Sequence, residues 1–199
     1  MKIIDSFLTS EEKKLLDTLR GLKSKLDDMS YQQYKRINPF MENIVDWNQH
    51  GNTHASKNSV VYDSATLIGD IDFGESLWIG PNCLLDGSGG LKIGSHCVFA
   101  AGVQVYTHDT AKWALSGGLA PYEHSPVIIG DCVFFGAQSI VTRGIEIGSH
   151  CLIGANTTLT KNIPAYSIVA GSPGRIIGRV IIDGADVQYE FDVQETHDD

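Results

Sequence analysis

The sequence lacks a long hydrophobic run. None of its apolar stretches approaches the roughly 18 residues that a membrane-spanning helix needs. The N-terminal segment MKIIDSFLTSEEKKLL is charged too early to be a signal peptide. These absences predict a cytoplasmic protein with no membrane insertion.

Basic residues and cysteines are also scarce. Fifteen Lys and Arg oppose 24 Asp and Glu, so the formal net charge is −9. This balance excludes a general nucleic-acid binder, which needs a basic surface to contact phosphates. The four cysteines, Cys83, Cys97, Cys132 and Cys151, form no CxxC pair. A zinc site is therefore not expected, and we interpret all four as small buried thiols.

What the sequence has is a six-residue repeat. Its large apolar residues are Val61, Leu67, Phe73, Ile79 and Leu85, then Ile93, Phe99 and Val105 after two inserted residues, and later Ile129, Phe135, Val141, Ile147, Ile153 and Leu159. Glycine often follows at the second position, and small or β-branched residues occupy the fifth. Helices repeat every 3.6 residues and half-buried strands every two. A period of six therefore predicts a solenoid of short strands and turns, with glycine permitting the tight corners.

The recurring segments IGPNCLL, IGSHCVFAAG, IGDCVFFGAQSIV and IGSHCLIGANTTLT resemble the hexapeptide-repeat family. The resemblance implies an all-β fold, a left-handed parallel β-helix of triangular section with three repeats per coil and four to five coils. It covers about residues 60–177. We therefore expect an N-terminal helical segment at 1–58, a β-helix domain at 59–177, and a C-terminal hairpin with an acidic tail at 178–199.

The flanking segments carry their own signals. Residues 9–29 are predicted to form a helix, with a capping box between Thr9 and Glu12. Its apolar stripe of four leucines and Met29 is expected either to pack against a coil end or to bind a partner as a docking helix. A second short helix is expected after Pro39. Near the other end, GRVIIDGADVQYEFDV has two β-rich runs around an Asp-Gly pair, which predicts a hairpin.

The repeat is interrupted at about residues 107–126. Long irregular loops in compact domains are usually functional or disordered, and the aromatic residues here argue against disorder. We interpret the segment as a loop that projects from the solenoid and walls a site. His108 opens it, and a neutral imidazole is well suited to take a proton from a hydroxyl. From the residues alone, a plain surface histidine remains the alternative, and we assign that role to His96 and His150.

The combination of YTHD, the loop and GANTTLTKNIPAYSIVAGSPGR is similar to the hexapeptide acyltransferases that use acetyl-CoA. The nearest pattern is that of maltose and galactoside O-acetyltransferases and bacterial polysaccharide O-acetyltransferases. This resemblance implies that His108 is the general base in direct transfer of an acetyl group to a hydroxyl of a sugar or surface polysaccharide precursor. It also implies acetyl-CoA as co-substrate, no metal, and a homotrimer with sites between subunits.

The same resemblance assigns further contacts. The implied cofactor-binding residues are Phe134, Gly136, Ala137, Ala155, Thr160, Lys161, Arg175 and Arg179. A backbone N–H near Gly136 and Ala137 is the implied oxyanion donor. The family often has another arginine three residues after Arg175, where this chain has Gly178. Candidates for substrate contacts or for support of His108 are Asp86, Trp113, Glu123 and His124.

Three alternatives stay open. One is an N-acetyltransferase acting on an amino-sugar nucleotide; such enzymes often carry an added nucleotide-binding element, which the first 58 residues could contain. Another is a zinc hydratase with the same β-helix fold, which requires three histidine ligands. The third is a non-catalytic β-helix scaffold, although such a protein has no use for the GANTTLTKNIPAYSIVAGSPGR segment.

Overall fold

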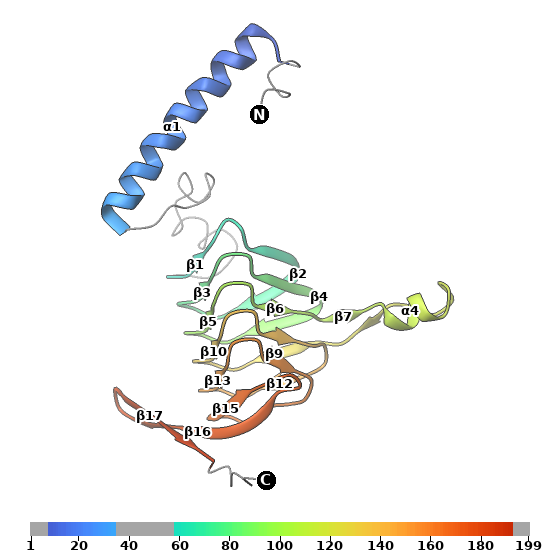
Figure 1. Ribbon diagram of the computed structural model, residues 1–199. Coiled ribbons are helices and arrows are strands. Elements are labelled where there is room, and N and C mark those ends of the chain that lie inside the picture. The colour runs from blue at the N-terminus through green and yellow to red at the C-terminus, as the bar shows by residue number, and fades with distance from the viewer. Residues whose placement is uncertain (1–7, 35–57, 193–199) are drawn as a thin grey trace, which may run out of the picture. The chain divides into compact units, whose positions relative to one another are not determined.

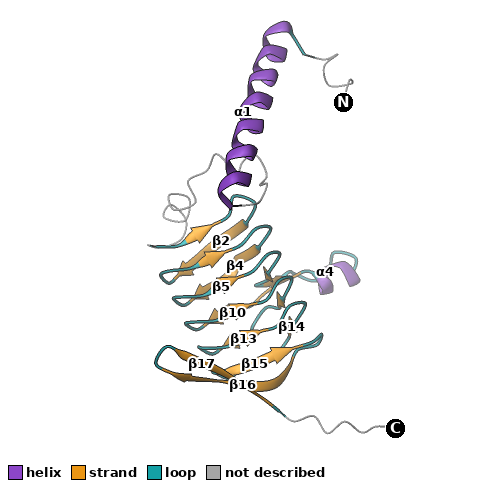
Figure 2. Cartoon of the chain, turned by 60° about the vertical axis from the view of Figure 1, so that its left-hand side comes forward, coloured by secondary structure: helices purple, strands orange, loops and turns teal. Residues whose placement is uncertain are grey.

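The structure is a computed structural model that describes residues 8–34 and 58–192 (Figures 1 and 2). The chain divides into two compact units, 1–45 and 46–199.

The described part of the first unit is helix α1, Ser10–Tyr34. The predicted capping box is confirmed, because Thr9 N donates to Glu12 Oε2 at 2.7 Å and Glu12 N donates to Thr9 Oγ1 at 3.3 Å. These bonds satisfy amides that the first helical turn leaves unpaired. Leu15, Leu19, Leu22 and Met29 of the apolar stripe are 41–64% exposed. No helix in the described ranges is long and apolar enough to cross a membrane. The expected helix after Pro39 lies outside the described residues.

The second unit is a parallel β-solenoid with three faces. The first face stacks β1 (Val60–Val61), β3 (Trp78–Ile79), β5 (Val98–Phe99), β10 (Phe134–Phe135), β13 (Leu152–Ile153) and β15 (Ser167–Ala170). The second face stacks the first halves of β2 (Thr66–Phe73) and β4 (Leu84–Ile93) with β6 (Gln104–Val105), β11 (Ile140–Val141) and β14 (Thr158–Leu159). The third face stacks the second halves of β2 and β4 with β9 (Val127–Ile129) and β12 (Glu146–Ile147). The predicted fold class is confirmed.

The solenoid makes about six turns, so the predicted number of four to five coils was too low. The coil continues beyond Leu159 with a slightly different spacing. Ile163 bridges to Ile147 on the third face, and Val169 pairs with Ile153 on the first. Neither residue falls on the six-residue period counted from Leu159, which is why the sequence pattern missed this turn.

The large apolar residues of the repeat fill the interior. Leu85, Phe99, Phe135 and Ile153 are fully buried, and the rings of Phe99 and Phe135 stack with their centroids 4.8 Å apart. Three of the cysteines lie at the fifth position and are buried, and burial raises the pKa of Cys97 to about 11. Cys132 is an exception to the prediction, because it occupies a fourth position and is only half-buried.

The prediction that the second-position glycines permit the tight corners is wrong. The left-handed conformation is adopted at the fourth position of the repeat, for example by His96 and Asn156 at φ values of 58° and 55°. The second-position glycines are required for another reason, the close approach of adjacent coils. A Cβ on Gly136 would lie 2.4 Å from Ala155 N, and one on Gly94 would lie 2.5 Å from Asp131 Oδ1.

The predicted C-terminal hairpin is present. Strand β16 (Arg175–Asp183) pairs antiparallel with β15 and, through a tight turn at Gly184, with β17 (Asp186–Phe191). Gly184 has φ +59°, a conformation that suits glycine. Because β16 begins at Arg175, the hairpin takes in the last residues that were expected to belong to the β-helix.

Candidate active site

The interruption in the repeat is a short ribbon that leaves the solenoid between the second and third faces (Figure 1). We call this corner of the solenoid the histidine edge. Strands β7 (His108–Asp109) and β8 (Glu123–His124) pair antiparallel, with His108 opposite His124. Helix α4 (Ala111–Leu115) lies at the outer end of the ribbon. Because β6 precedes the ribbon and β9 follows it, two strands of the solenoid fix its base.

The outer end of the ribbon has its own small packing contact. The rings of Trp113 and Tyr122 meet edge to face with centroids 5.5 Å apart. Trp113 is nevertheless 42% exposed. This contact orders the loop, and the exposed part of the indole stays available to a ligand.

His108 is held by a buried carboxylate. Its Nδ1 lies 2.6 Å from Asp86 Oδ2 and 3.3 Å from Ser88 Oγ. The Asp86 side chain is fully buried, whereas that of His108 is 35% exposed. The pair therefore has one end fixed inside the protein and the other end open at the histidine edge.

Several donors keep Asp86 ionised. Burial acts to raise the pKa of its carboxyl group, but the Ser88 hydroxyl and amide, the Thr107 amide and the His108 ring outweigh this and lower it well below its usual range. The amides of Ser88 and Thr107 each donate at 2.9 Å. An ionised carboxylate only accepts hydrogen bonds, so the neutral His108 ring carries its proton on Nδ1. Its Nε2 is left with a lone pair that can take a proton.

Asp86 was a candidate for a substrate contact or for support of His108, and the structure places its buried carboxylate against the His108 ring. Its carboxylate faces His108 and the chain around Thr107, not an open surface. The sequence did contain a signal for this. Asp86 occupies a second position of the repeat, where half of the repeats have glycine, and the pairing of Leu85 with Val105 sets it beside the start of the ribbon.

Glu123 is occupied by two cations. Its Oε1 lies 2.8 Å from Lys112 Nζ, and its Oε2 lies 2.9 Å from Arg143 Nη2. Glu123 therefore does not orient His108. His124 lies next to His108, with ring centroids 6.1 Å apart. Sequence reasoning missed Arg143 altogether, since a single basic residue in a regular repeat carries no pattern.

The corner between the first and second faces is lined by alanines. We call it the alanine edge, after the third-position residues Ala101, Ala137 and Ala155. Within residues 58–192 none of their amides donates a hydrogen bond, although the Ala137 carbonyl accepts one from Asn156 N at 2.9 Å. Gly136 is different, because its N–H donates to Ile153 O at 2.7 Å. Of the two residues implied as oxyanion donors, only Ala137 therefore has a free N–H.

The third corner, between the third and first faces, has the opposite character. We call it the serine edge. Side chains of the following coil cap its third-position amides: Glu75 N donates to Ser95 Oγ at 3.0 Å, Ser95 N to Asp131 Oδ1 at 2.7 Å, and Asp131 N to Ser149 Oγ at 3.0 Å. These amides are not available to a ligand.

The other predicted cofactor contacts fall into two sets. Phe134 is 45% exposed on the first face, next to the alanine edge, and Arg175 at the start of β16 pairs with Ala170 at the same side. Thr160 and Lys161 follow β14 and lie on the histidine edge. Arg179 forms an ion pair with Glu190, which raises the pKa of the guanidinium and lowers that of the carboxyl.

The two sets lie at two different corners of one solenoid, separated by the second face. Six residue-to-residue steps lead from Ala137 to Arg143 across the second face, and an extended chain of that length spans at most roughly 20 Å. A groove runs beside the alanine edge on that face, lined by Asn82, Gln104, Gln138 and Asn156 among others. A larger cavity at the first coils, lined in part by Leu67 and Phe73, contains none of the predicted site residues. The described residues hold no group of three metal-ligating side chains.

The profile of the hexapeptide repeat of succinyl-transferase matches residues 126–161. The matched residues run from just before β9 to just after β14, within the six-residue repeat of the solenoid. Among curated relatives, a Staphylococcus aureus 2,3,4,5-tetrahydropyridine-2,6-dicarboxylate N-acetyltransferase is 36% identical over 70 residues, which are 35% of this chain and 29% of the relative. The chain thus matches less than a third of that relative's length.

Two solved acyltransferase structures have a similar fold. A variant of AntD, an N-acyltransferase from Bacillus cereus in complex with dTDP-4-amino-4,6-dideoxyglucose and coenzyme A, is 26% identical, with a TM-score of 0.56 over 61% of this chain and 69% of AntD. A hexapeptide-repeat acetyltransferase from Vibrio cholerae is 21% identical, with a TM-score of 0.60 over 82% of this chain and 91% of that one.

Proposed function

We propose that this hexapeptide-repeat protein is an acetyl-CoA-dependent acyltransferase whose acceptor is a hydroxyl group of a sugar. The observation that carries the proposal is the pairing of His108 with a buried, ionised Asp86 at an open edge of the solenoid. The carboxylate fixes the tautomer of the ring, and Nε2 has no hydrogen-bond partner among the described residues, as a general base requires. The likeness to AntD supports the acyltransferase class.

In the proposed reaction, His108 Nε2 takes the proton from the acceptor hydroxyl as its oxygen attacks. Acetyl-CoA supplies an acyl carbon that is activated as a thioester. The free Ala137 N–H donates to the carbonyl oxygen as negative charge develops there, and such a donor contributes about 2.7–4 kcal/mol. When the carbon–sulfur bond breaks, His108 returns its proton to the departing sulfur. The products are the acetyl ester and free coenzyme A, and no cysteine takes part.

The alanine edge fits coenzyme A in two respects. Its uncapped amides and small side chains allow an amide-containing chain such as the pantetheine arm to lie against the backbone and bond to it. The exposed Phe134 ring offers an apolar contact beside that edge. Lys161 and Arg175 are the cations that we assign to the phosphates, because Arg179 is engaged by Glu190.

We further propose that the site forms between two copies of the chain in a homotrimer. The base lies on the histidine edge and the free amide on the alanine edge, which are different corners of one solenoid. Both can reach the same thioester only if the histidine edge of one copy faces the alanine edge of the next. Mixing His108→Ala chains with Ala137→Pro chains, which lack the amide, should restore part of the activity in mixed trimers.

An amino-sugar nucleotide is the second candidate acceptor. It is favoured by AntD, which is an N-acyltransferase in complex with a 4-amino sugar nucleotide. Both acceptor classes use the same base and the same thioester. The protein would then form an amide, which resists mild alkaline hydroxylamine, whereas an acetyl ester is cleaved by it.

The test of the proposal is thiol release from acetyl-CoA across a panel of sugars, nucleotide sugars and amino-sugar nucleotides, followed by hydroxylamine treatment of the products. We expect acceptor-dependent release and a product that hydroxylamine cleaves. Products that resist hydroxylamine would be amides, and they would identify the acceptor as an amino-sugar nucleotide. Failure to bind coenzyme A at millimolar concentration would contradict the acyltransferase proposal and favour a scaffold.

A further inference from the structure

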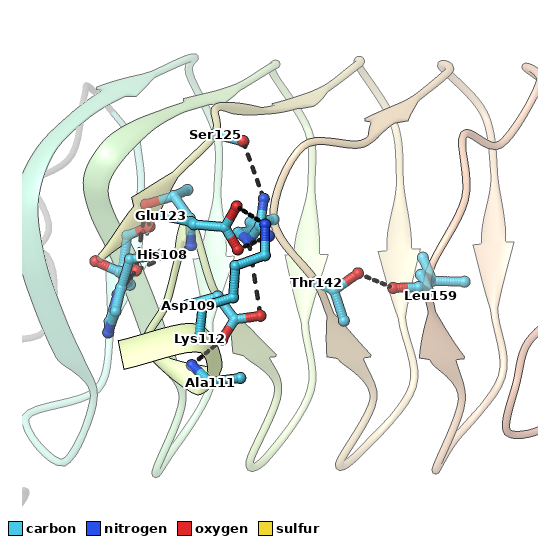
Figure 3. A network of polar contacts seen from close by, with 11 residues as sticks. His108, Asp109, Ala111, Lys112, Glu123, Ser125, Thr142 and Leu159 are labelled. Atoms are coloured by element: carbon cyan, nitrogen blue, oxygen red, sulfur yellow. Dashed lines mark hydrogen bonds and ion pairs between the residues drawn. The ribbon is translucent and has the colours of Figure 1, made fainter. Parts of the chain in front are cut away.

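The ribbon that carries His108 is joined to the solenoid by one side chain from the following coil. Arg143 comes directly after β11 and Thr142, and its guanidinium contacts both strands of the ribbon. Nη2 bonds to Glu123 Oε2 at 2.9 Å, and Nε lies 3.7 Å from Asp109 Oδ2. Glu123 and Asp109 are themselves opposite each other in the ribbon. Figure 3 shows Asp109, Glu123 and Ser125 gathered at this place.

Arg143 also reaches the base of the ribbon. Its Nη1 donates to Ser125 Oγ at 3.3 Å. The neighbouring Gly144 has φ +74°, and a Cβ there would lie 3.1 Å from Ser125 Cβ. A glycine at this corner therefore lets the coil come close enough for the guanidinium to span the ribbon. The Arg143 side chain is only 28% exposed, so its ion pairs are partly shielded from water and salt.

We propose that Arg143 is a positioning residue for the acyl transfer, acting by fixing the ribbon that carries His108. The inference rests on the proposed function. Each of Asp109 and Glu123 is adjacent in sequence to one of the paired histidines, so the guanidinium restrains both strands directly beside His108 and His124. Asp86 sets the rotation and tautomer of the His108 ring, and Arg143 sets where the backbone beneath that ring lies. Catalysis needs both, because a displacement of about 1 Å at the reacting groups can cost on the order of 100-fold in rate.

Lys112 provides a matched comparison. It also pairs with Glu123, but its side chain is 69% exposed and it belongs to the loop itself, so it does not join the ribbon to the solenoid. Thr142 is a second comparison. It precedes Arg143 and donates to Leu159 O at 3.0 Å, which ties it to the next coil and not to the ribbon (Figure 3).

The experiment compares Arg143→Met, Arg143→Lys and Glu123→Gln with the controls Lys112→Met and Thr142→Val. For Arg143→Met we expect kcat to fall about 10- to 100-fold while KM for acetyl-CoA stays within about twofold. Arg143→Lys should recover part of kcat, because an ammonium can reach Glu123 but cannot span both strands. The Arg143→Met and Glu123→Gln losses should not add in the double variant. Both controls should keep the wild-type kcat.

Amide hydrogen exchange of residues 107–126 is measured on the same variants. We expect faster exchange there in Arg143→Met, with unchanged exchange in β10, β11 and β13 and an unchanged unfolding midpoint. This readout does not depend on the reaction, so it tests the restraint even if the acyltransferase proposal fails. Unchanged exchange in the ribbon, or a control variant that loses as much kcat as Arg143→Met, would overturn the inference.

Discussion

The serine edge and the alanine edge are built by the same repeat, but they differ in whether side chains accept hydrogen bonds from their backbone amides. Both corners place a third-position residue at the turn of the coil, and each of these residues except Pro81 has a backbone amide. On the serine edge, hydroxyl and carboxylate side chains of the next coil accept from these amides. On the alanine edge, alanine occupies the equivalent position in three coils, and the amides of Ala101, Ala137 and Ala155 donate no hydrogen bond within residues 58–192. Ala101 and Ala155 are exposed, so water can bond to their amides in the free protein, and a ligand that displaces this water can bond to the same donors.

The largest expected effect on the rate is that of replacing His108 on the histidine edge, compared with replacing His96 on the serine edge. We expect His108→Ala to lower kcat at least about 100-fold, because it removes the general base. The control is His96→Asn, since His96 has φ 58° and asparagine tolerates that conformation. It should retain the wild-type rate in the thiol-release assay. Equal rates for His108→Ala and wild type would remove His108 from the mechanism.

The next effect in size concerns the carboxylate beneath the base. Asp86→Asn replaces an obligate acceptor by an amide that can donate to Nδ1, and so favours the wrong tautomer of His108. A lost hydrogen bond to a charged group costs about 1.5–3 kcal/mol, which corresponds to roughly 10- to 100-fold in kcat. The measurement is kcat with saturating acetyl-CoA. A rate within twofold of wild type would show that Asp86 serves the fold alone.

The same variant makes a prediction for stability against pH. Because the pKa of Asp86 is lowered in the folded protein, its carboxylate stabilises the fold above the unfolded-state pKa of about 3.9. That contribution is lost as the pH falls toward the lowered pKa. The difference in unfolding free energy between wild type and Asp86→Asn should therefore be constant above about pH 5 and shrink below about pH 4. A difference that grows in acid would contradict the assignment.

The sequence predicted the repeat, its core and the interruption, because each depends on a local pattern that recurs. The large apolar residues at every sixth place are buried as expected, and the helix cap at Thr9 and the Asp-Gly hairpin form as expected. The sequence could not predict which amides are free, because that depends on the residue one coil away. The roles of Asp86 and Arg143 also depend on stacking between coils, in which partners lie far apart along the chain.

A smaller effect is expected from making the alanine edge resemble the serine edge. Ala155 occupies the third position one coil after Ala137, just as Ser149 occupies the third position one coil after Asp131. Ala155→Ser should therefore place a hydroxyl where the Ala137 amide can donate to it, as Asp131 N donates to Ser149 Oγ. The capping bond must then break before the amide can meet the substrate. At about 0.5–1.5 kcal/mol for such a bond, we expect kcat to fall roughly 2- to 10-fold. The control is Ala165→Ser, the same change at an exposed third-position alanine of the serine edge, which should keep the wild-type rate.

The smallest expected effect is the reverse change, Ser149→Ala, which leaves Asp131 N without its 3.0 Å acceptor. Asp131 is exposed, so water can replace the lost hydroxyl, and the loss of unfolding free energy should lie near the lower end of the usual range, about 0.5 kcal/mol. In a chain of this size that lowers Tm by roughly 1–2 °C. The rate of acetyl transfer should not change, because the serine edge takes no part in binding. If Ser149→Ala lowered the transfer rate as much as Ala155→Ser does, the two edges would not differ in function, and the free amides of the alanine edge would need another explanation.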